Sequence, residues 1–133
     1  MLFAFSLRAV FEIRSPQLSS LSDAPLVSFA GRVHTFLFQE HRWLLSDAPQ
    51  DEHVRRIADA VQVGLRWGID TEWDLCRFVV IELQAGPTLG RIDGPSWALD
   101  ILRQDDDTGA GKADALEHYY YDVLGEGPQR EAE

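Results

Sequence analysis

A helix-ending signal and a helix-starting signal lie about five residues apart in the stretch RWGIDTEWDLCRF, near the middle of the chain. Gly68 follows the last residue of an apolar helical pattern, and glycine readily adopts the left-handed conformation that ends many helices. Thr71 can then cap a new helix, and Asp74, three residues later, completes a pattern similar to a capping box. The spacing predicts a tight helical hairpin at residues 67–72, with Trp73 in the first turn of the second helix.

Apolar residues recur at helical spacing over most of the remaining chain. We expect a short helix near Ser15–Leu21, followed by longer helices at about 25–41, 50–67, 72–84, 95–103 and 112–124. The helix at 72–84 is apolar on nearly all sides, which is typical of a helix that its neighbours bury. The intervening segments 84–95 and 104–112 are rich in Gly, Pro or Asp and are expected to be loops. The sequence therefore predicts an all-α fold, a compact bundle of about six helices around the helix near 72–84.

A length of 133 residues favours one domain with a single core. We expect an apolar N-terminal segment at 1–14, a helical domain at 15–124 and a disordered acidic tail at 125–133. The apolar start is interrupted by Arg8 and lacks a preceding basic region and a cleavage site, so a secretory signal is not expected. The single cysteine, Cys76, cannot form an internal disulfide, which favours a reducing, cytoplasmic location.

The net charge is −10 and the isoelectric point is near 4.7. Nucleic-acid binding depends mainly on cations that neutralise phosphates, so a nucleic-acid partner is not expected. The same argument weighs against an anionic membrane surface. A basic partner protein would instead be attracted during encounter.

Catalytic and metal-binding patterns are weak. The acidic run Asp105–Asp107 lacks the alternating ligands, central Gly and terminal Glu of a calcium loop. The four histidines are scattered, and no two have the i,i+4 spacing of a helical metal site; they are His34, His41, His53 and His118. Cys76 lies within the most apolar helix, where a structural thiol is expected rather than a nucleophile. The sequence therefore predicts no catalytic residue, no cofactor and no metal, although a metal-dependent enzyme remains a third alternative.

The aromatic residues are more informative. Trp73 lies in a first helical turn between two acids, and three consecutive tyrosines, Tyr119, Tyr120 and Tyr121, cannot all face one core. Partly exposed aromatics are typical of the centres of protein interfaces. We therefore predict that these four residues contribute to the binding of a partner protein.

Two stretches resemble a known family. Residues 67–78, WGIDTEWDLCRF, match a pattern of aromatic-Gly-Ile, then Thr-Glu, an acidic and an apolar residue, then Arg-Phe. Residues 95–102, PSWALDIL, resemble the family's Pro-Trp-Ala…Ile-Leu segment, with Ser96 as an insertion. The family consists of small helical proteins encoded beside effector, spike and adaptor genes of bacterial type VI secretion clusters, and the resemblance covers roughly residues 50–124.

This resemblance implies accessory work without catalysis, as a co-chaperone that binds an adaptor-chaperone, an effector protein, or both during toxin loading. The alternative is an immunity protein that neutralises a cognate, basic toxin. An immunity protein against a nuclease is expected to gather carboxylates on one face, whereas here they are spread along the chain.

Overall fold

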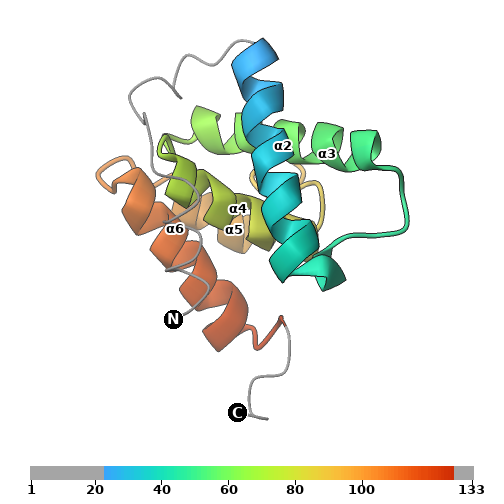
Figure 1. The fold of residues 1–133 in the computed structure, drawn as a ribbon. Coiled ribbons are helices and arrows are strands. Elements are labelled where there is room, and N and C mark those ends of the chain that lie inside the picture. Colours follow the sequence, from blue (N-terminus) through green and yellow to red (C-terminus); the bar gives the residue numbers. More distant parts are fainter. Residues whose placement is uncertain (1–22, 128–133) are drawn as a thin grey trace.

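The computed structural model describes residues 23–127, which form five α-helices and no strand (Figure 1). The α-helices are α2 (Asp23–Glu40), α3 (Gln50–Arg66), α4 (Glu72–Ala85), α5 (Ser96–Leu102) and α6 (Gly109–Glu117). A short 3-10 turn, η2 (Arg42–Leu44), follows α2, and a π-helical segment, η3 (His118–Val123), continues α6. The predicted all-α class is therefore confirmed. The short helix near Ser15–Leu21, the segment 1–14 and the last part of the tail, 128–133, lie outside the described residues.

The core lies between α2, α3 and α4. The apolar residues that recur at helical spacing in α2 are all buried, namely Leu26, Phe29, Val33, Phe36 and Leu37. Of those that recur in α3, Ile57, Ala58 and Val61 are buried, while Val54 and Leu65 pack against the core from its edge. Burying each large aliphatic or aromatic side chain contributes about 1.5–3 kcal/mol. No helix in the described part of the chain is both long and apolar enough to cross a lipid bilayer.

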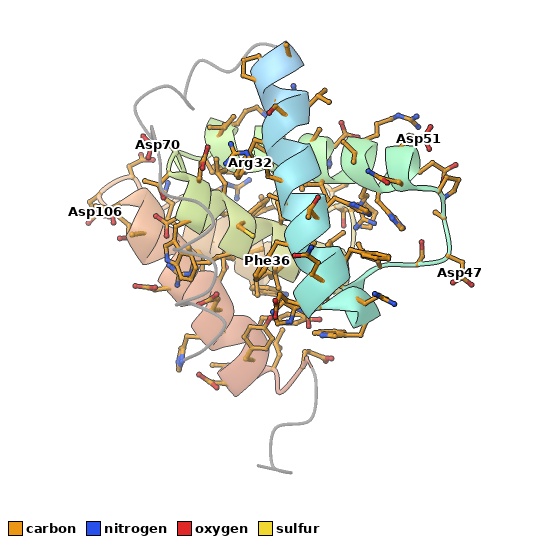
Figure 2. The ribbon with its side chains drawn as sticks, in the orientation of Figure 1. Arg32, Phe36, Asp47, Asp51, Asp70 and Asp106 are labelled. Carbon is orange, nitrogen blue, oxygen red and sulfur yellow. The ribbon has the colours of Figure 1, made fainter. Side chains whose placement is uncertain are left out.

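Helix α4 is the most enclosed helix, since ten of its fourteen residues are buried. Three of these ten are carboxylates, and each forms an ion pair with an arginine. Glu72 pairs with Arg32 of α2, which is labelled in Figure 2. Asp74 pairs with Arg77 of the same helix, and Glu82 pairs with Arg56 of α3. These three ion pairs were not predicted, because the apolar pattern of α4 gives no sign that its carboxylates are buried. Burial raises the pKa of Glu82, although the Arg56 guanidinium acts in the opposite direction.

The helical hairpin is confirmed. Gly68 has a φ of +88°, the Gly68 N–H donates to the Leu65 carbonyl at 3.1 Å, and the Ile69 N–H donates to the Gly64 carbonyl at 3.0 Å. This pair of hydrogen bonds is the Schellman arrangement, and Ile69 is fully buried against the turn that it closes.

The start of α4 needs one correction. The Thr71 hydroxyl caps α4 by accepting from the Asp74 N–H at 3.1 Å, as predicted. The Asp74 carboxylate does not complete a capping box, because it accepts from the Thr71 hydroxyl at 2.8 Å and from Arg77 at 3.0 Å. The Asp74 carboxylate turns toward Arg77 because a charge-assisted hydrogen bond to a guanidinium is stronger than a bond to the Thr71 N–H.

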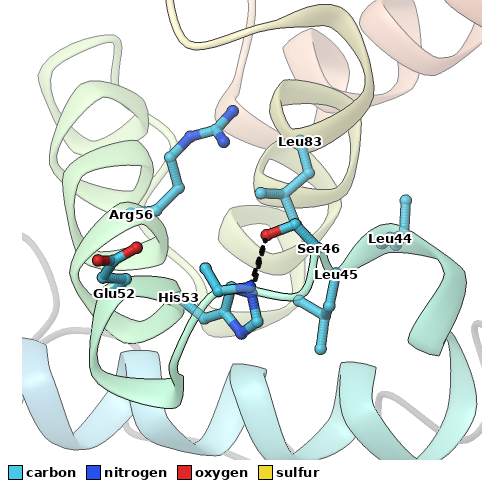
Figure 3. A pocket seen from close by; sticks show the side chains of 8 residues that line it. Leu44, Leu45, Ser46, Glu52, His53, Arg56 and Leu83 are labelled. Atoms are coloured by element: carbon cyan, nitrogen blue, oxygen red, sulfur yellow. Dashed lines mark hydrogen bonds between the residues drawn. The ribbon is translucent and has the colours of Figure 1, made fainter.

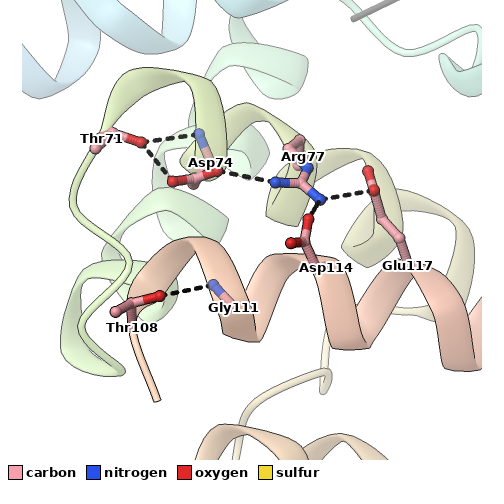
Figure 4. A network of polar contacts seen from close by, with 7 residues as sticks. All are labelled: Thr71, Asp74, Arg77, Thr108, Gly111, Asp114 and Glu117. Carbon is pink, nitrogen blue, oxygen red and sulfur yellow. Dashed lines mark hydrogen bonds and ion pairs between the residues drawn. The ribbon is translucent and has the colours of Figure 1, made fainter. Parts of the chain in front are cut away.

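Helix α6 lies beside α4 and runs parallel to it with a constant offset of 37 residues. Arg77 binds Asp114, and Gln84 binds Tyr121, both at this separation. The capping threonines Thr71 and Thr108 have the same separation (Figure 4). The two helices therefore start at the same end of the molecule.

The start of α6 was predicted too late, at residue 112. The Thr108 hydroxyl accepts from the Gly111 N–H at 2.9 Å and caps a helix that begins at Gly109. A Cβ at Gly109 would lie 2.6 Å from the Gly68 carbonyl oxygen, so the glycine permits this close approach. Lys112 is buried, and its ammonium donates to the Trp67 carbonyl at 2.8 Å, which caps the end of α3.

Candidate protein-docking surface

The three consecutive tyrosines lie within the π-helical segment η3. The Leu124 N–H donates to the Tyr119 carbonyl, five residues earlier, at 2.8 Å, and the Glu126 N–H donates to the Tyr120 carbonyl at 3.0 Å. Glu126, which lies in the segment that we expected to be a disordered tail, is thus hydrogen-bonded back to the helix. π-helical turns are rare and are often found at functional sites.

The wider winding changes which side chains face the core. The α-helical pattern predicted a packing face of Leu116, Tyr119, Tyr120 and Val123. Leu116 and Tyr120 are buried, but Val123 is 55% exposed, so that part of the prediction is wrong. An i→i+5 turn contains one residue more than an α-turn, which rotates later side chains around the axis. Tyr121 is half-buried and takes a place beside α4 instead.

An aromatic cluster forms where η3 meets α5. The Tyr119 ring stacks on the Trp97 ring, with centroids 5.1 Å apart and an interplanar angle of 14°. Tyr120 lies 6.2 Å from Trp97 and meets Tyr121 edge-on at 5.4 Å. The Tyr121 hydroxyl accepts from the Gln84 side-chain amide at 2.7 Å. We define the aromatic cluster as Trp97, Tyr119, Tyr120 and Tyr121.

Exposure differs within the aromatic cluster. Tyr120 is 7% exposed, while Trp97, Tyr119 and Tyr121 are half-buried and reach the surface. Burial raises the pKa of the Tyr120 hydroxyl, and the neighbouring Glu126 carboxylate raises it further, so this phenol stays neutral. Val123 and Leu124, 55% and 41% exposed, extend the apolar surface at the end of η3.

Carboxylates dominate the part of the chain that carries the aromatic cluster. Residues 96–127 contain only two basic residues, and one of them, Lys112, is buried against the Trp67 carbonyl. The same segment contains eight acids, namely Asp100, Asp105, Asp106, Asp107, Asp114, Glu117, Asp122 and Glu126. Residues 23–66, which include all of α2 and α3, carry five arginines and six acids and are nearly balanced. Carboxylates occur along the whole described chain, as expected, and residues 96–127, which form α5, α6 and η3, have the largest excess of acids over Lys and Arg.

Arg77 is the centre of the polar network between α4 and α6 (Figure 4). Its guanidinium donates to Asp74 at 3.0 Å, to Glu117 at 2.8 Å and to Asp114. Burial alone would lower the pKa of the guanidinium, but the bonds to Glu117 and Asp114 raise it above its usual value. This network holds α6, and the tyrosines that follow it, at a fixed position on α4.

Trp73 is not part of the aromatic cluster. Its side chain is half-buried and packs against the core, with the Arg77 guanidinium carbon 5.9 Å from the ring centroid. With the offset of 37 residues between α4 and α6, Trp73 lies beside residue 110. Tyr120 follows ten residues later, which places it roughly 15 Å from Trp73 along the helix axis. The structure thus brings Tyr119, Tyr120 and Tyr121 together and leaves Trp73 separate.

The most exposed aromatic side chains in the described residues are ones that sequence reasoning did not select. Trp43 is 56% exposed and Phe38 is 48% exposed, with the Arg42 guanidinium 4.1 Å above the Phe38 ring. Trp43 follows the end of α2 and belongs to no predicted apolar face, which is the signal that could have identified it.

The remaining candidate residues have structural surroundings. Cys76 is fully buried in α4, and burial raises the pKa of its thiol far above the usual range. His118 forms a surface ion pair with Asp122 at 3.1 Å when protonated. Within residues 23–127, no three His, Cys, Asp or Glu side chains gather as metal ligands would.

Comparison with protein-family models, with curated proteins and with solved structures finds no match to this chain.

Proposed function

We propose that this protein is a protein-binding accessory factor and that the aromatic cluster is the centre of its docking surface. The observation that carries the proposal is the stacking of Tyr119 on Trp97 within a π-helical segment, beside exposed Val123 and Leu124. Tyrosine and tryptophan are enriched at the energetic centres of protein interfaces, because their rings bury a large area at low entropic cost.

The excess of carboxylates in residues 96–127 favours a partner that carries positive charge. Asp100, Asp122 and Glu126 are exposed on the same elements as the aromatic cluster or directly after them. Carboxylates at the rim of an interface accelerate encounter with a basic partner and make the association rate depend on salt. A partner with a basic, partly apolar surface fits this arrangement.

The resemblance to type VI secretion accessory proteins supports a more specific proposal. It spans residues 50–124, and this range includes Trp97 and all three tyrosines. On this basis the partner is an adaptor-chaperone, an effector protein, or a complex of the two, and the protein acts as a co-chaperone during effector loading in the cytoplasm.

One observation favours a second function. The concentration of eight acids in residues 96–127 would suit the neutralisation of a basic toxin, as an immunity protein does. The two functions differ in what is bound: a co-chaperone binds through the adaptor, whereas an immunity protein captures the toxin directly and blocks its activity.

The test is a binding assay between the purified protein and the adaptor and effector encoded beside it. Tyr119→Ala removes the stacking partner of Trp97, and Trp43→Ala is the matched control because Trp43 is an exposed aromatic outside the aromatic cluster. Loss of a central interface aromatic costs about 2 kcal/mol, which weakens binding roughly 30-fold. Circular dichroism establishes that each variant is folded.

We expect Tyr119→Ala to lose the partner and Trp43→Ala to retain it. Trp73→Ala is included because Trp73 was a predicted contact, and its separation from the aromatic cluster leads us to expect retained binding. A folded Tyr119→Ala protein that binds both partners as tightly as the wild type would refute the proposed surface. Direct capture and inhibition of the toxin, without the adaptor, would favour the immunity function.

A further inference from the structure

A chain of three polar side chains connects the loop before α3 to the buried face of α2. The Ser46 hydroxyl lies 3.3 Å from Nε2 of His53, and Nδ1 of His53 lies 3.3 Å from Nε2 of His34. The two imidazole planes are inclined by 26°, and their centroids lie 5.3 Å apart, so the rings meet nearly edge to edge. A nucleophile next to a base, with a third group holding the base, is the arrangement that activates a serine hydroxyl.

Solvent exposure increases from His34 through His53 to Ser46. A nucleophile must be accessible to substrate, whereas the residue that holds the base can be buried. His34 is 7% exposed, His53 is half-buried and Ser46 is exposed. Burial lowers the pKa of His34, and the neighbouring His53 lowers it further, so His34 is neutral near pH 7 and can accept a hydrogen bond. If Nδ1 of His53 donates to His34, Nε2 of His53 is free to accept the Ser46 proton. The Ala48 N–H donates to the Ser46 oxygen at 3.2 Å and leaves that proton available.

A pocket of about 330 Å³ opens beside the Ser46 hydroxyl (Figure 3). Leu44, Leu45 and Leu83 form its apolar wall, and Arg56 lines it together with Ser46 and His53. The Arg56 guanidinium is held by the Glu82 carboxylate at 3.0 Å, so a fixed positive charge lines the same space as the nucleophile. The Glu52 carboxylate also lines the pocket, so its polar lining includes one arginine and one acid beside Ser46 and His53.

We propose that Ser46, His53 and His34 form a serine–histidine–histidine site that hydrolyses small, uncharged carboxylic esters with a short acyl chain. Ser46 is the nucleophile, His53 is the general base, and His34 is a positioning residue that fixes the His53 tautomer. This activity is separate from partner binding by the aromatic cluster, and neither depends on the other.

The chemistry proceeds in two balanced steps. In the first, the Ser46 oxygen forms a bond to the ester carbonyl carbon while its proton passes to Nε2 of His53. The bond from that carbon to the alcohol oxygen breaks, and the alcohol leaves with the proton that His53 held. In the second, a water molecule gives a proton to His53 and attacks the acyl-serine, which releases the carboxylic acid and restores the Ser46 hydroxyl.

The first experiment uses the full chain and a fluorophosphonate probe, with the adduct mapped by mass spectrometry. We expect a single adduct on Ser46, retained in Ser28→Ala and absent in Ser46→Ala. Ser28 is the matched control because it is an exposed serine on α2 outside the pocket. His53→Gln should lower the rate of labelling roughly 100-fold or more, which is the usual contribution of a general base.

The second experiment measures the hydrolysis of p-nitrophenyl acetate, with Ser46→Ala defining the background from surface imidazoles. We expect the wild type to exceed that background at least tenfold, a conservative margin for combined nucleophilic and base catalysis. His34→Gln should retain part of the excess, since its amide oxygen can accept from His53, whereas His34→Leu should lose kcat without a change in KM. Failure to label Ser46, or equal hydrolysis by the wild type and Ser46→Ala, would overturn the proposal. Neither result involves the docking surface.

Discussion

Replacing Arg77 by methionine tests the polar network between α4 and α6. The Arg77 side chain is only 9% exposed, and its guanidinium contacts Asp74, Asp114 and Glu117. These partners differ greatly in exposure: the Asp74 side chain is 7% exposed, Glu117 32% and Asp114 71%. The cost of losing the guanidinium therefore depends mainly on Asp74.

The expected magnitude follows from these exposures. Asp114 stays solvated after the substitution, and an exposed ion pair is worth about 0.2–1 kcal/mol. Asp74 is left buried without its cation, and breaking a buried pair from one side costs about 3–5 kcal/mol. Because Asp74 keeps the Thr71 hydroxyl at 2.8 Å, we expect the lower end. The free energy of unfolding should fall by about 3 kcal/mol, and the thermal midpoint by roughly 10 °C.

Urea denaturation followed by tryptophan fluorescence measures this change. Asp114→Asn is the matched control, which removes an exposed partner of the same guanidinium and should cost less than about 1 kcal/mol. The double variant Arg77→Met with Asp74→Asn should recover at least half of the loss, because it no longer buries an unpaired charge. The reasoning is refuted if Arg77→Met costs no more than Asp114→Asn, or if the double variant is less stable than Arg77→Met alone.

Three further predictions concern single residues. Gly68→Val should lower stability by about 1–2 kcal/mol through backbone strain alone, because φ is +88° and no atom lies within 4 Å of the added Cβ; Gly31→Ala, in open space on α2, is the control and should not destabilise. A thiol reagent should modify Cys76 only as fast as the native protein unfolds, and rapid labelling of the folded protein would contradict its burial. Burial and the neighbouring His53 lower the pKa of His34 in the folded protein below its unfolded value near 6.5. The stability that the neutral His34 contributes is therefore complete above pH 6.5, and it is lost as the pH falls towards the pKa of the folded state. Urea midpoints at pH 7.5 and 5.5 should therefore decrease more in the wild type than in His34→Gln, and equal decreases would count against the buried neutral imidazole.

Local sequence signals predicted the elements whose hydrogen bonds are themselves local. The Gly68 stop and the Thr71 cap each depend on groups within five residues, so the hairpin could be predicted from one short stretch. The apolar faces of α2 and α3 were equally accessible, because their periodicity is continuous over three or more turns.

Features that depend on distant groups could not be predicted in this way. The π-helical winding at Tyr119–Tyr121 is an exception, because its bonds from Leu124 to Tyr119 and from Glu126 to Tyr120 are local. It was missed because the apolar pattern also fits an α-helix, which would turn Val123 toward the core. The early start of α6 depends on a close approach to Gly68, 41 residues earlier in the chain. The prediction that three consecutive tyrosines cannot all face one core is confirmed, since only Tyr120 is buried. Their stacking partner Trp97 could not be predicted, because it depends on how α5 packs beside α6.

The parallel arrangement of α4 and α6 has a consequence for the order of folding. Two adjacent helices that run in the same direction cannot be joined by a short turn, so the chain must travel back along the molecule through residues 86–108. Contacts such as Arg77–Asp114 therefore close a loop of 37 residues, whereas the Gly68 hairpin brings α3 and α4 together at almost no loop-closure cost. Contacts between neighbouring segments form early, and those that close long loops form late. We therefore expect the α3–α4 hairpin to form before α6 docks on α4, and the tyrosine surface to become complete only after that docking.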